Sequence, residues 1–348
     1  MKKIKFLVLA TVLFSTIAGI SFYLVRSASY TIQTSGKLYI VNKLSRSITV
    51  FDLFKGEELT EFTLEIEPHE VTTLTGQNNV VVTNYGRPKV NGKSVSVIDT
   101  KTNDIIKTID LDGSLKPHGI VAFPNTTKVG VVTDIGNELV VVNVETGTVE
   151  KKIQTQQVVS HLLVLHPNKS LAYVTNIISG SVSVIDLVQD KVIEIILCGK
   201  GTEGIDITPD GTEIWVTNNK EESISVINTE TYQITDTLAT GKESLRLKFS
   251  IDGKYCLVPN SSDGTISVYD RHSKKQIKTI HIPGKKNLLE RVLYHTPRPV
   301  GILMHPNGLY AFVANSNADK IEVIDMKTFT LVSTIGTGRV PDGLTFVE

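Results

Sequence analysis

Three histidines and two carboxylates stand at equivalent places along this 348-residue chain. His69 and His161 each lie fourteen residues before the threonine of a recurring Val-Thr-Asn phrase, and Glu203 takes the same place in another copy. With one inserted residue, His118 takes the place in a further copy, and the same alignment gives Asp342 in the C-terminal segment. Neutral imidazoles and carboxylates are good ligands for divalent transition metals. The set therefore predicts a candidate ligand site, with His69, His118 and His161 as candidate metal ligands.

The same residues also suit other roles, and the sequence leaves these open. Each side chain is able to hydrogen-bond the backbone of a neighbouring strand, and together they suit a small anionic ligand or ordered water as well as a metal. In two copies the aligned residue is apolar, Leu245 or Val300. Glycines that suit close approach of neighbouring strands follow four of the positions: Gly119, Gly204, Gly301 and Gly343.

The Val-Thr-Asn phrase belongs to a repeat that runs along most of the chain. Its closing asparagines, with a shorter first copy included, are Asn42, Asn84, Asn176, Asn218, Asn260 and Asn315. A second phrase of the type Ser-Val-Ser-Val-Ile-Asp occurs seven times and closes at residues 52, 99, 143, 186, 228, 270 and 325. Most of its steps are 42 to 47 residues long. Self-similarity at this period signals a repeat architecture.

One copy, residues 202–241, contains four strand-like segments. They cover residues 204–208, 213–217, 223–227 and 232–238, and Pro209-Asp-Gly211 forms a turn signal between the first two. Four strands in about forty residues is the pattern of a β-propeller blade. The sequence therefore predicts an all-β chain that forms a seven-bladed β-propeller of four-stranded blades.

The two ends of the repeat region complement each other. The first copy starts at residue 37 with what corresponds to a second strand, and the chain ends in residues 340–347 with what corresponds to a first strand. We expect the C-terminal strand to complete the first blade, which closes the ring and removes two open sheet edges. The inner strands then surround a central channel, and five contiguous positions at its mouth carry the ionisable side chains.

The repeat resembles that of the YVTN-repeat (YncE-like, surface-layer-type) β-propellers. Tyr173-Val-Thr-Asn176 carries the signature in full, whereas the copy ending at Asp134 departs from it by one residue type. The resemblance covers residues 36 to 348. It implies an exported binding or scaffold protein, although the propeller fold by itself hosts many functions.

Composition argues against a dedicated nucleic-acid surface. Lysine plus arginine and aspartate plus glutamate both number 36, so the formal net charge is zero. Nucleic-acid binding normally needs a basic excess. We expect the partner to be a protein, a peptide or a small molecule at the face of the propeller.

The N-terminus has the pattern of an export signal. Three lysines precede an uncharged, mostly apolar run over residues 6–25, and Arg26 follows it. The run is long enough for a helix that crosses a bilayer. We therefore interpret residues 1–29 as a signal peptide or an N-terminal membrane anchor, residues 30–36 as a linker and residues 37–348 as the propeller. Either form places the propeller outside the cytoplasm, secreted or periplasmic if the segment is cleaved.

One insertion interrupts the repeat at about residues 285–297. Leu288, Leu289, Val292 and Leu293 in it fall at helical spacing. Segments inserted between blades often cover a channel mouth or meet a partner, so this segment is a candidate lid beside the ionisable positions.

Three functions compete on this evidence. The first is a non-catalytic binding or scaffold propeller at the cell envelope, and no catalytic residue is assigned. The second is a metal-dependent hydrolase that resembles lactonase propellers and uses the channel-mouth cluster with a bound divalent metal. The third is a propeller that binds a haem-like cofactor, because Pro117-His118-Gly119 is similar to a motif of haem d1-binding propellers.

Overall fold

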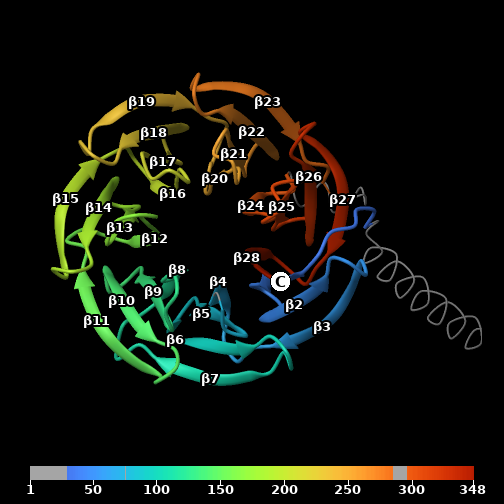
Figure 1. Cartoon of the computed structure of the whole chain (residues 1–348), viewed down its shortest axis with the longest axis horizontal. Coiled ribbons are helices and arrows are strands. Elements are labelled where there is room, and N and C mark those ends of the chain that lie inside the picture. The colour runs from blue at the N-terminus through green and yellow to red at the C-terminus, as the bar shows by residue number, and fades with distance from the viewer. Residues whose placement is uncertain (1–29, 75, 285–295) are drawn as a thin grey trace, which may run out of the picture.

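Seven four-stranded antiparallel sheets surround one central axis in the computed structural model (Figure 1). The structure describes residues 30–74, 76–284 and 296–348, and in these ranges the ordered elements are all strands. This confirms the predicted seven-bladed all-β propeller. The predicted N-terminal apolar helix and most of the predicted lid lie outside the described residues. Within these ranges, none of the elements is a helix with the length and apolarity to cross a bilayer.

Each blade runs from an inner strand beside the axis to an outer strand at the rim. We number the blades from the one that contains both the first and the last strand, and each group of strands below follows this order. The inner strands are β28 (Pro341–Val347), β4 (Pro68–Leu74), β8 (Pro117–Ala122), β12 (Ser160–Leu165), β16 (Thr202–Ile207), β20 (Lys248–Phe249) and β24 (Pro299–Met304). The second strands are β1 (Lys37–Asn42), β5 (Asn79–Arg87), β9 (Lys128–Thr133), β13 (Leu171–Asn176), β17 (Glu213–Asn218), β21 (Tyr255–Asn260) and β25 (Tyr310–Asn315).

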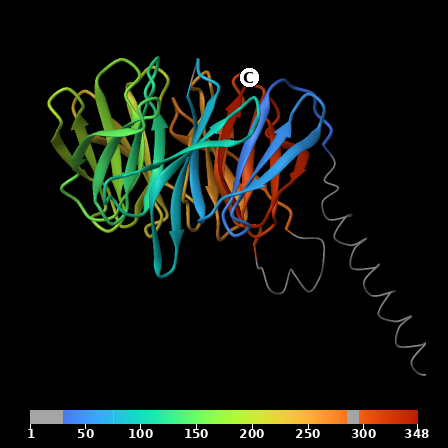
Figure 2. The same cartoon turned by 90° about the horizontal axis from the view of Figure 1, so that it is seen from below.

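The third and fourth strands complete each blade. The third strands are β2 (Ser47–Asp52), β6 (Val90–Asp99), β10 (Glu138–Asn143), β14 (Ser181–Asp186), β18 (Ser223–Asn228), β22 (Thr265–Asp270) and β26 (Lys320–Asp325). The fourth strands are β3 (Glu57–Thr63), β7 (Ile105–Asp110), β11 (Thr148–Gln154), β15 (Lys191–Leu197), β19 (Ile234–Ala239), β23 (Lys275–His281) and β27 (Thr330–Gly336). The hairpin of β5 and β6 is longer than its equivalents and extends beyond the other described loops on its face of the ring (Figure 2).

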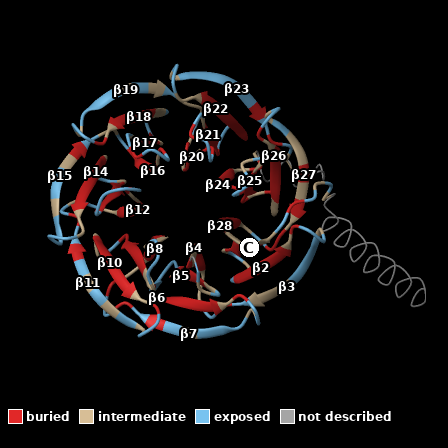
Figure 3. Ribbon diagram, in the orientation of Figure 1, coloured by how far each residue is buried: buried red, intermediate tan, exposed pale blue. Residues whose placement is uncertain are grey.

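Burial follows the position of a strand within its blade. The second strands are almost wholly buried and the outer strands are mostly exposed (Figure 3). Branched apolar residues of adjacent blades pack face to face, as Val81 and Val95 of blade 2 do with Val131 and Val140 of blade 3. Removal of this apolar surface from water is the main stabilising term between blades.

The C-terminal strand completes the first blade, as the sequence predicts. Strand β28 pairs antiparallel with β1, with Leu38 opposite Phe346 and Ile40 opposite Leu344. Residues 30–36 then cross the joint between blades 7 and 1, where Tyr30 donates a hydrogen bond to the carbonyl of Leu53 (2.7 Å). Both unpaired edges that the two chain ends would leave are thereby removed.

The asparagine of the Val-Thr-Asn phrase ties the second strand to the third. In blade 5, the Asn218 side-chain amide donates to the hydroxyls of Ser223 (3.1 Å) and Ser225 (3.0 Å), and its carbonyl accepts from Thr202 (2.8 Å). The same amide–hydroxyl pairing, which we call the asparagine clamp, occurs at Asn42, Asn84, Asn176 and Asn260. Buried polar side chains are stable only when paired in this way. The repeat motif is therefore largely structural.

Candidate functional site

The five ionisable residues predicted from the repeat gather at one end of the central axis. Each stands on an inner strand, and all are buried, with exposed fractions of 9% or less. They come from blades 1 to 5, which are consecutive around the ring (Figure 1). Blades 6 and 7 supply Leu245 and Val300 instead. The structure thus brings together the whole predicted set: His69, His118, His161, Glu203 and Asp342.

The three imidazoles form a continuous row of tilted rings. The ring centroids of His69 and His118 are 3.8 Å apart, and those of His118 and His161 are 3.5 Å apart. The Nε2 atoms of His69 and His118 approach to 3.1 Å. Two nitrogens bound to one tetrahedral zinc ion lie about 3.3 Å apart, given Zn–N bonds of about 2.0–2.1 Å. The first two rings therefore already have the spacing of ligands on a single ion.

His161 differs from the other two because carboxylates hold both of its ring nitrogens. Its Nδ1 lies 3.0 Å from Asp134 Oδ1 and its Nε2 lies 3.5 Å from Glu203 Oε1. Burial lowers the pKa of His161, but the hydrogen bonds to Asp134 and Glu203 outweigh it and raise the pKa to about 9. This ring is an imidazolium at neutral pH and has no free lone pair for a metal.

His69 and His118 are neutral imidazoles. Burial, with the nearby charge of Lys43, keeps the pKa of His69 well below its usual value. Burial and the neighbouring His161 do the same for His118. The Nδ1 atoms of both rings are buried without a hydrogen-bond partner among the described residues. Buried, neutral and unpartnered nitrogens are a costly arrangement in the absence of a ligand.

Four residues outside the predicted set complete the site. Arg246 of blade 6 donates to Glu203 (3.2 Å) and to Glu70 of blade 2 (2.8 Å). Blades 2 and 6 lie on opposite sides of the ring, so the Arg246 side chain spans the mouth (Figure 1). The ammonium of Lys43 lies 2.6 Å from His69 Nε2 and 3.3 Å from Asp342 Oδ2. We call the nine residues the channel cluster: Lys43, His69, Glu70, His118, Asp134, His161, Glu203, Arg246 and Asp342.

A local rule places Glu70 and Arg246. Both stand one position after the aligned residue, where blades 1, 3, 5 and 7 have glycine. A Cβ on Gly343 would meet the Glu70 backbone at 2.9 Å, and one on Gly204 would meet the Arg246 backbone at 2.8 Å. The glycine of one blade therefore makes room for the larger residue of the next. A charged residue at this otherwise glycine-rich position was the sequence signal that identifies both.

Asp134 marks the one repeat in which the Val-Thr-Asn phrase ends in aspartate. The third strand of its blade has Glu138 and Val140 where a clamped strand has two hydroxyl residues. Thr133 lies opposite Glu138, at the place that the clamp asparagine takes opposite Ser223 in blade 5, so blade 3 has no clamp. Asp134 lies one position later and pairs with His161, while Tyr85 donates to its other oxygen (2.8 Å). This departure from the repeat was the signal for a site residue.

The channel cluster has more negative than positive charge. Glu70, Asp134, Glu203 and Asp342 supply four carboxylates, against three cations from Lys43, His161 and Arg246. Two groups, His69–Glu70–His118 and His118–Asp134–His161, have ligand atoms within 4.8 Å of one another. The first group suits a metal better, because both nitrogens of His161 are already paired. A net negative site with two neutral imidazoles favours a divalent cation over an anion.

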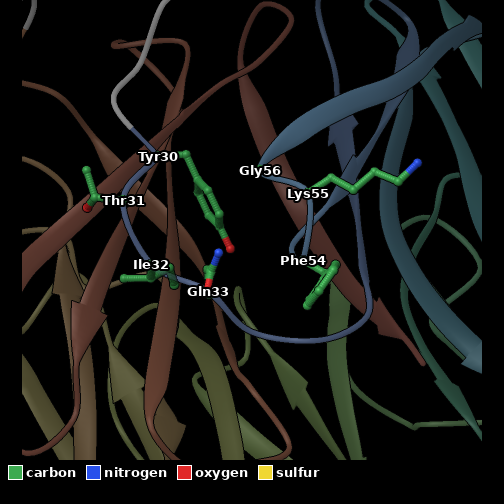
Figure 4. Close-up of a pocket in the computed structure, with 7 residues that line it drawn as sticks. All are labelled: Tyr30, Thr31, Ile32, Gln33, Phe54, Lys55 and Gly56. Carbon is green, nitrogen blue, oxygen red and sulfur yellow. The ribbon is translucent and has the colours of Figure 1, made fainter.

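Two surface pockets lie elsewhere. One, of about 400 Å³, is lined by residues 30–33 and 54–56, where the N-terminal segment packs on blade 1 (Figure 4). The other, of about 510 Å³, lies between blades 3 and 4 beside Phe123 and His166. Neither contains a residue of the channel cluster.

The chain matches the profile of a known protein family. The profile described as "Cytochrome D1 heme domain" matches residues 97–289, which is more than half of the chain. The matched range contains His118, His161, Glu203 and Arg246 but ends before Asp342 and begins after His69. A comparison with curated proteins finds no match.

Two solved structures are similar to this one. The Kuenenia stuttgartiensis hydrazine synthase has a TM-score of 0.69 at 16% identity, over 82% of this chain and 91% of that one. A functionally unknown protein from Desulfotomaculum acetoxidans has a TM-score of 0.74 at 16% identity, over 90% of this chain and 99% of that one. At this identity the likeness supports the propeller fold alone.

The family description implies a haem, and the channel cluster does not fit one in this arrangement. The three imidazole rings lie 3.5–3.8 Å apart, so no macrocycle lies between them. Arg246 spans the mouth and the ammonium of Lys43 covers His69 Nε2. The two Nε2 atoms of His69 and His118, 3.1 Å apart, fit a single small ion more readily than a flat ring.

Proposed function

We propose, from the premise that this chain belongs to the Cytochrome D1 heme domain family, that its propeller is a binding protein for one divalent transition-metal ion at the channel mouth. The observation that carries the proposal is the pair of buried, neutral histidines, His69 and His118, whose Nε2 atoms are 3.1 Å apart. The spacing of these two Nε2 atoms supports a shared ion.

His69, His118 and Glu70 would hold the ion through two imidazole nitrogens and one carboxylate oxygen. The bound ion would supply a Lewis acid at the mouth. His161 serves as a charged neighbour, fixed by Asp134 and Glu203, that positions the His118 ring from its other face. Such outer partners orient metal ligands and tune their affinity.

The second candidate is a haem-type cofactor, which the family match favours. It requires Arg246 and Lys43 to withdraw from the mouth, because both lie across the histidines. An exported location is part of the proposal and rests on the sequence of residues 1–29. A scaffold role remains compatible with either ligand, because the outer surface of the propeller takes no part in the site.

Metal content and visible absorption of the full chain test the two candidates. The protein is purified without chelator or affinity nickel, and its metal-to-chain ratio is measured by elemental analysis before and after titration with Co²⁺. The test variant replaces His69 and His118 by alanine. The control replaces the exposed His272, which belongs to a loop of blade 6.

One ion per chain in the wild type and the control, lost in the double variant, supports the metal proposal. A pigment band in the visible spectrum that is lost in the same variant supports the haem candidate instead. A folded wild type that binds neither, or a double variant that binds Co²⁺ as tightly as wild type, overturns the proposed site.

A further inference from the structure

Two nitrogen atoms, one from Lys43 and one from His118, lie close to the Nε2 atom of His69. The His69 Nε2 atom lies 2.6 Å from the Lys43 ammonium and 3.1 Å from His118 Nε2. An ammonium group has three donors and no lone pair. His69 Nε2 must therefore be the acceptor, and its proton lies on Nδ1. A single lone pair thus faces two neighbours at once, and the nearer one is a cation.

Lys43 is held here by an anion as well. Its ammonium lies 3.3 Å from Asp342 Oδ2, so an imidazole lone pair and a carboxylate oxygen both point at it. These are the two ligand types that a divalent transition metal takes from protein. The ammonium therefore lies where such an ion would meet the His69 lone pair.

We infer that Lys43 is a built-in competitor whose ammonium covers the His69 ligand atom, so that a metal ion must displace it to bind. This inference rests on the proposed function, since it concerns the regulation of the same site. It predicts that replacing Lys43 by an uncharged residue strengthens metal binding. A merely supporting role for Lys43 predicts the opposite.

Lys43 has a path out of the mouth, in contrast to Arg246. Its side chain is 23% exposed and belongs to the turn that follows β1. A lysine has a flexible four-carbon stem, so its ammonium is able to swing into solvent at small cost. The side chain of Arg246 is only 10% exposed and forms ion pairs with two carboxylates, those of Glu70 and Glu203. Lys43 is thus the mobile cation of the cluster, and Arg246 is the fixed one.

The charge balance agrees with displacement. Departure of Lys43 leaves four carboxylates against His161 and Arg246, so the site becomes more negative as the ion enters. A unit charge a few ångströms from a metal ion, even with the strong screening found near a surface, changes affinity by at least about tenfold. A unit charge that is exposed on the same face but distant from the ion is largely screened by solvent and salt, so it changes metal affinity little.

Metal titration of two matched lysine variants tests the inference. Lys43→Met removes the ammonium and keeps the length of the stem. Lys242→Met removes a lysine from the loop between β19 and β20, where the residue is exposed on the mouth face and outside the channel cluster. Full-length wild type and both variants are stripped of metal and titrated with Zn²⁺ and Co²⁺ by calorimetry, and thermal unfolding checks that each is folded.

The expected result is a dissociation constant lowered by about 10- to 100-fold in Lys43→Met. Lys242→Met is expected to stay within about threefold of wild type, because an exposed charge outside the site is screened. Binding by wild type, with tighter binding by Lys43→Met, supports the inference.

Two failures are distinguishable. If wild type binds and Lys43→Met binds equally or more weakly, the competitor role is overturned and the metal site remains. If neither folded protein binds either ion, the proposed metal site is overturned together with the inference. A triple variant with Lys43→Met, His69→Ala and His118→Ala must lose the gain, because the gain requires the two imidazoles.

Discussion

The two sides of the channel mouth share one backbone but differ in chemistry. Blades 1 to 5 place five ionisable residues at the start of their inner strands, and blades 6 and 7 place Leu245 and Val300 at the same point. All seven blades nevertheless have four antiparallel strands in the same order. The fold therefore does not depend on the ionisable residues, whose buried charges are costly to maintain.

One of the five blades that carry ionisable residues, blade 3, also lacks the asparagine clamp. Blades 1, 2, 4, 5 and 6 each have an asparagine clamp, whereas blade 3 has Thr133 at the clamp position and then Asp134, which pairs with His161. Blade 7 keeps Asn315, but its third strand has Lys320 and Glu322 in place of the hydroxyl residues. Blades 3 and 7 thus both depart from the clamp, but only the departure in blade 3 is accompanied by a residue of the channel cluster, Asp134.

Arg246 is the single charged group that the apolar side contributes to the channel cluster, and its loss gives the largest expected effect. Arg246→Met leaves the buried Glu203 and the partly buried Glu70 with one partner fewer. Removing one member of a buried ion pair costs about 3–5 kcal/mol. Urea unfolding at pH 7 measures the change in the free energy of unfolding.

The matched control is Arg298→Met. Arg298 pairs with Glu243 at 2.7 Å but is 39% exposed, so its loss costs about 0–1 kcal/mol. If the two variants lower the free energy of unfolding equally, the ion pairs that Arg246 makes with Glu70 and Glu203 across the mouth add no stability beyond that of a surface pair.

The charge on His161 makes the polar side sensitive to pH. Its pKa is raised to about 9 in the folded, metal-free protein, above the ordinary value of about 6.5. The stability gained from the charge is therefore fully present below pH of about 6.5 and is lost as the pH rises through about 9. The expected loss is roughly 3 kcal/mol.

Asp134→Asn removes the main partner of this charge and sharpens the test. The pKa of His161 should fall, and stability between pH 6.5 and 9 should become nearly flat. Unfolding free energies measured across this range, with NMR titration of the imidazole, check both outcomes. A slope unchanged from wild type would contradict the assignment of the charge to His161.

The asparagine clamp allows the same comparison within the structural pattern. Asn218→Ala in blade 5 removes hydrogen bonds to Thr202, Ser223 and Ser225 and should cost about 2 kcal/mol. Asn315→Ala in blade 7 removes a hydrogen bond to the Val313 carbonyl (2.9 Å) and should cost about half as much. Thermal unfolding of the two variants measures the difference, and a larger loss in blade 7 would refute the clamp as a stabilising device.

The smallest expected effect concerns backbone strain beside the mouth. Val159 has a φ of 60° and Gly201 a φ of 74°, at the same position two residues before the aligned residue. A β-branched residue in the left-handed region is strained, so Val159→Gly should raise the free energy of unfolding by up to about 1 kcal/mol. Gly201→Ala should lower it, since its Cβ would meet Asn219. Chemical denaturation resolves the two signs.

The sequence by itself determined the seven blades, their closure by the C-terminal strand and the five ionisable residues at one mouth. Strand periodicity and a fixed repeat length carry this information, because the backbone of every blade is built from local contacts. The glycines after His118, Glu203 and Asp342 also predicted close approach of neighbouring blades, and Gly119, Gly204 and Gly343 do abut the next inner strand.

Only the tertiary structure decided how these residues are paired and charged. Arg246 meets Glu70 across 176 positions of sequence, and Lys43 meets Asp342 across the ring closure. These contacts depend on how far a side chain extends across the mouth toward another blade. The repeat pattern describes each blade separately and so does not contain this information. Burial then makes His69 and His118 neutral while two carboxylates keep His161 charged, although all three occupy one aligned position. Equivalent residues acquire different chemistry because the ring gives each a different set of neighbours.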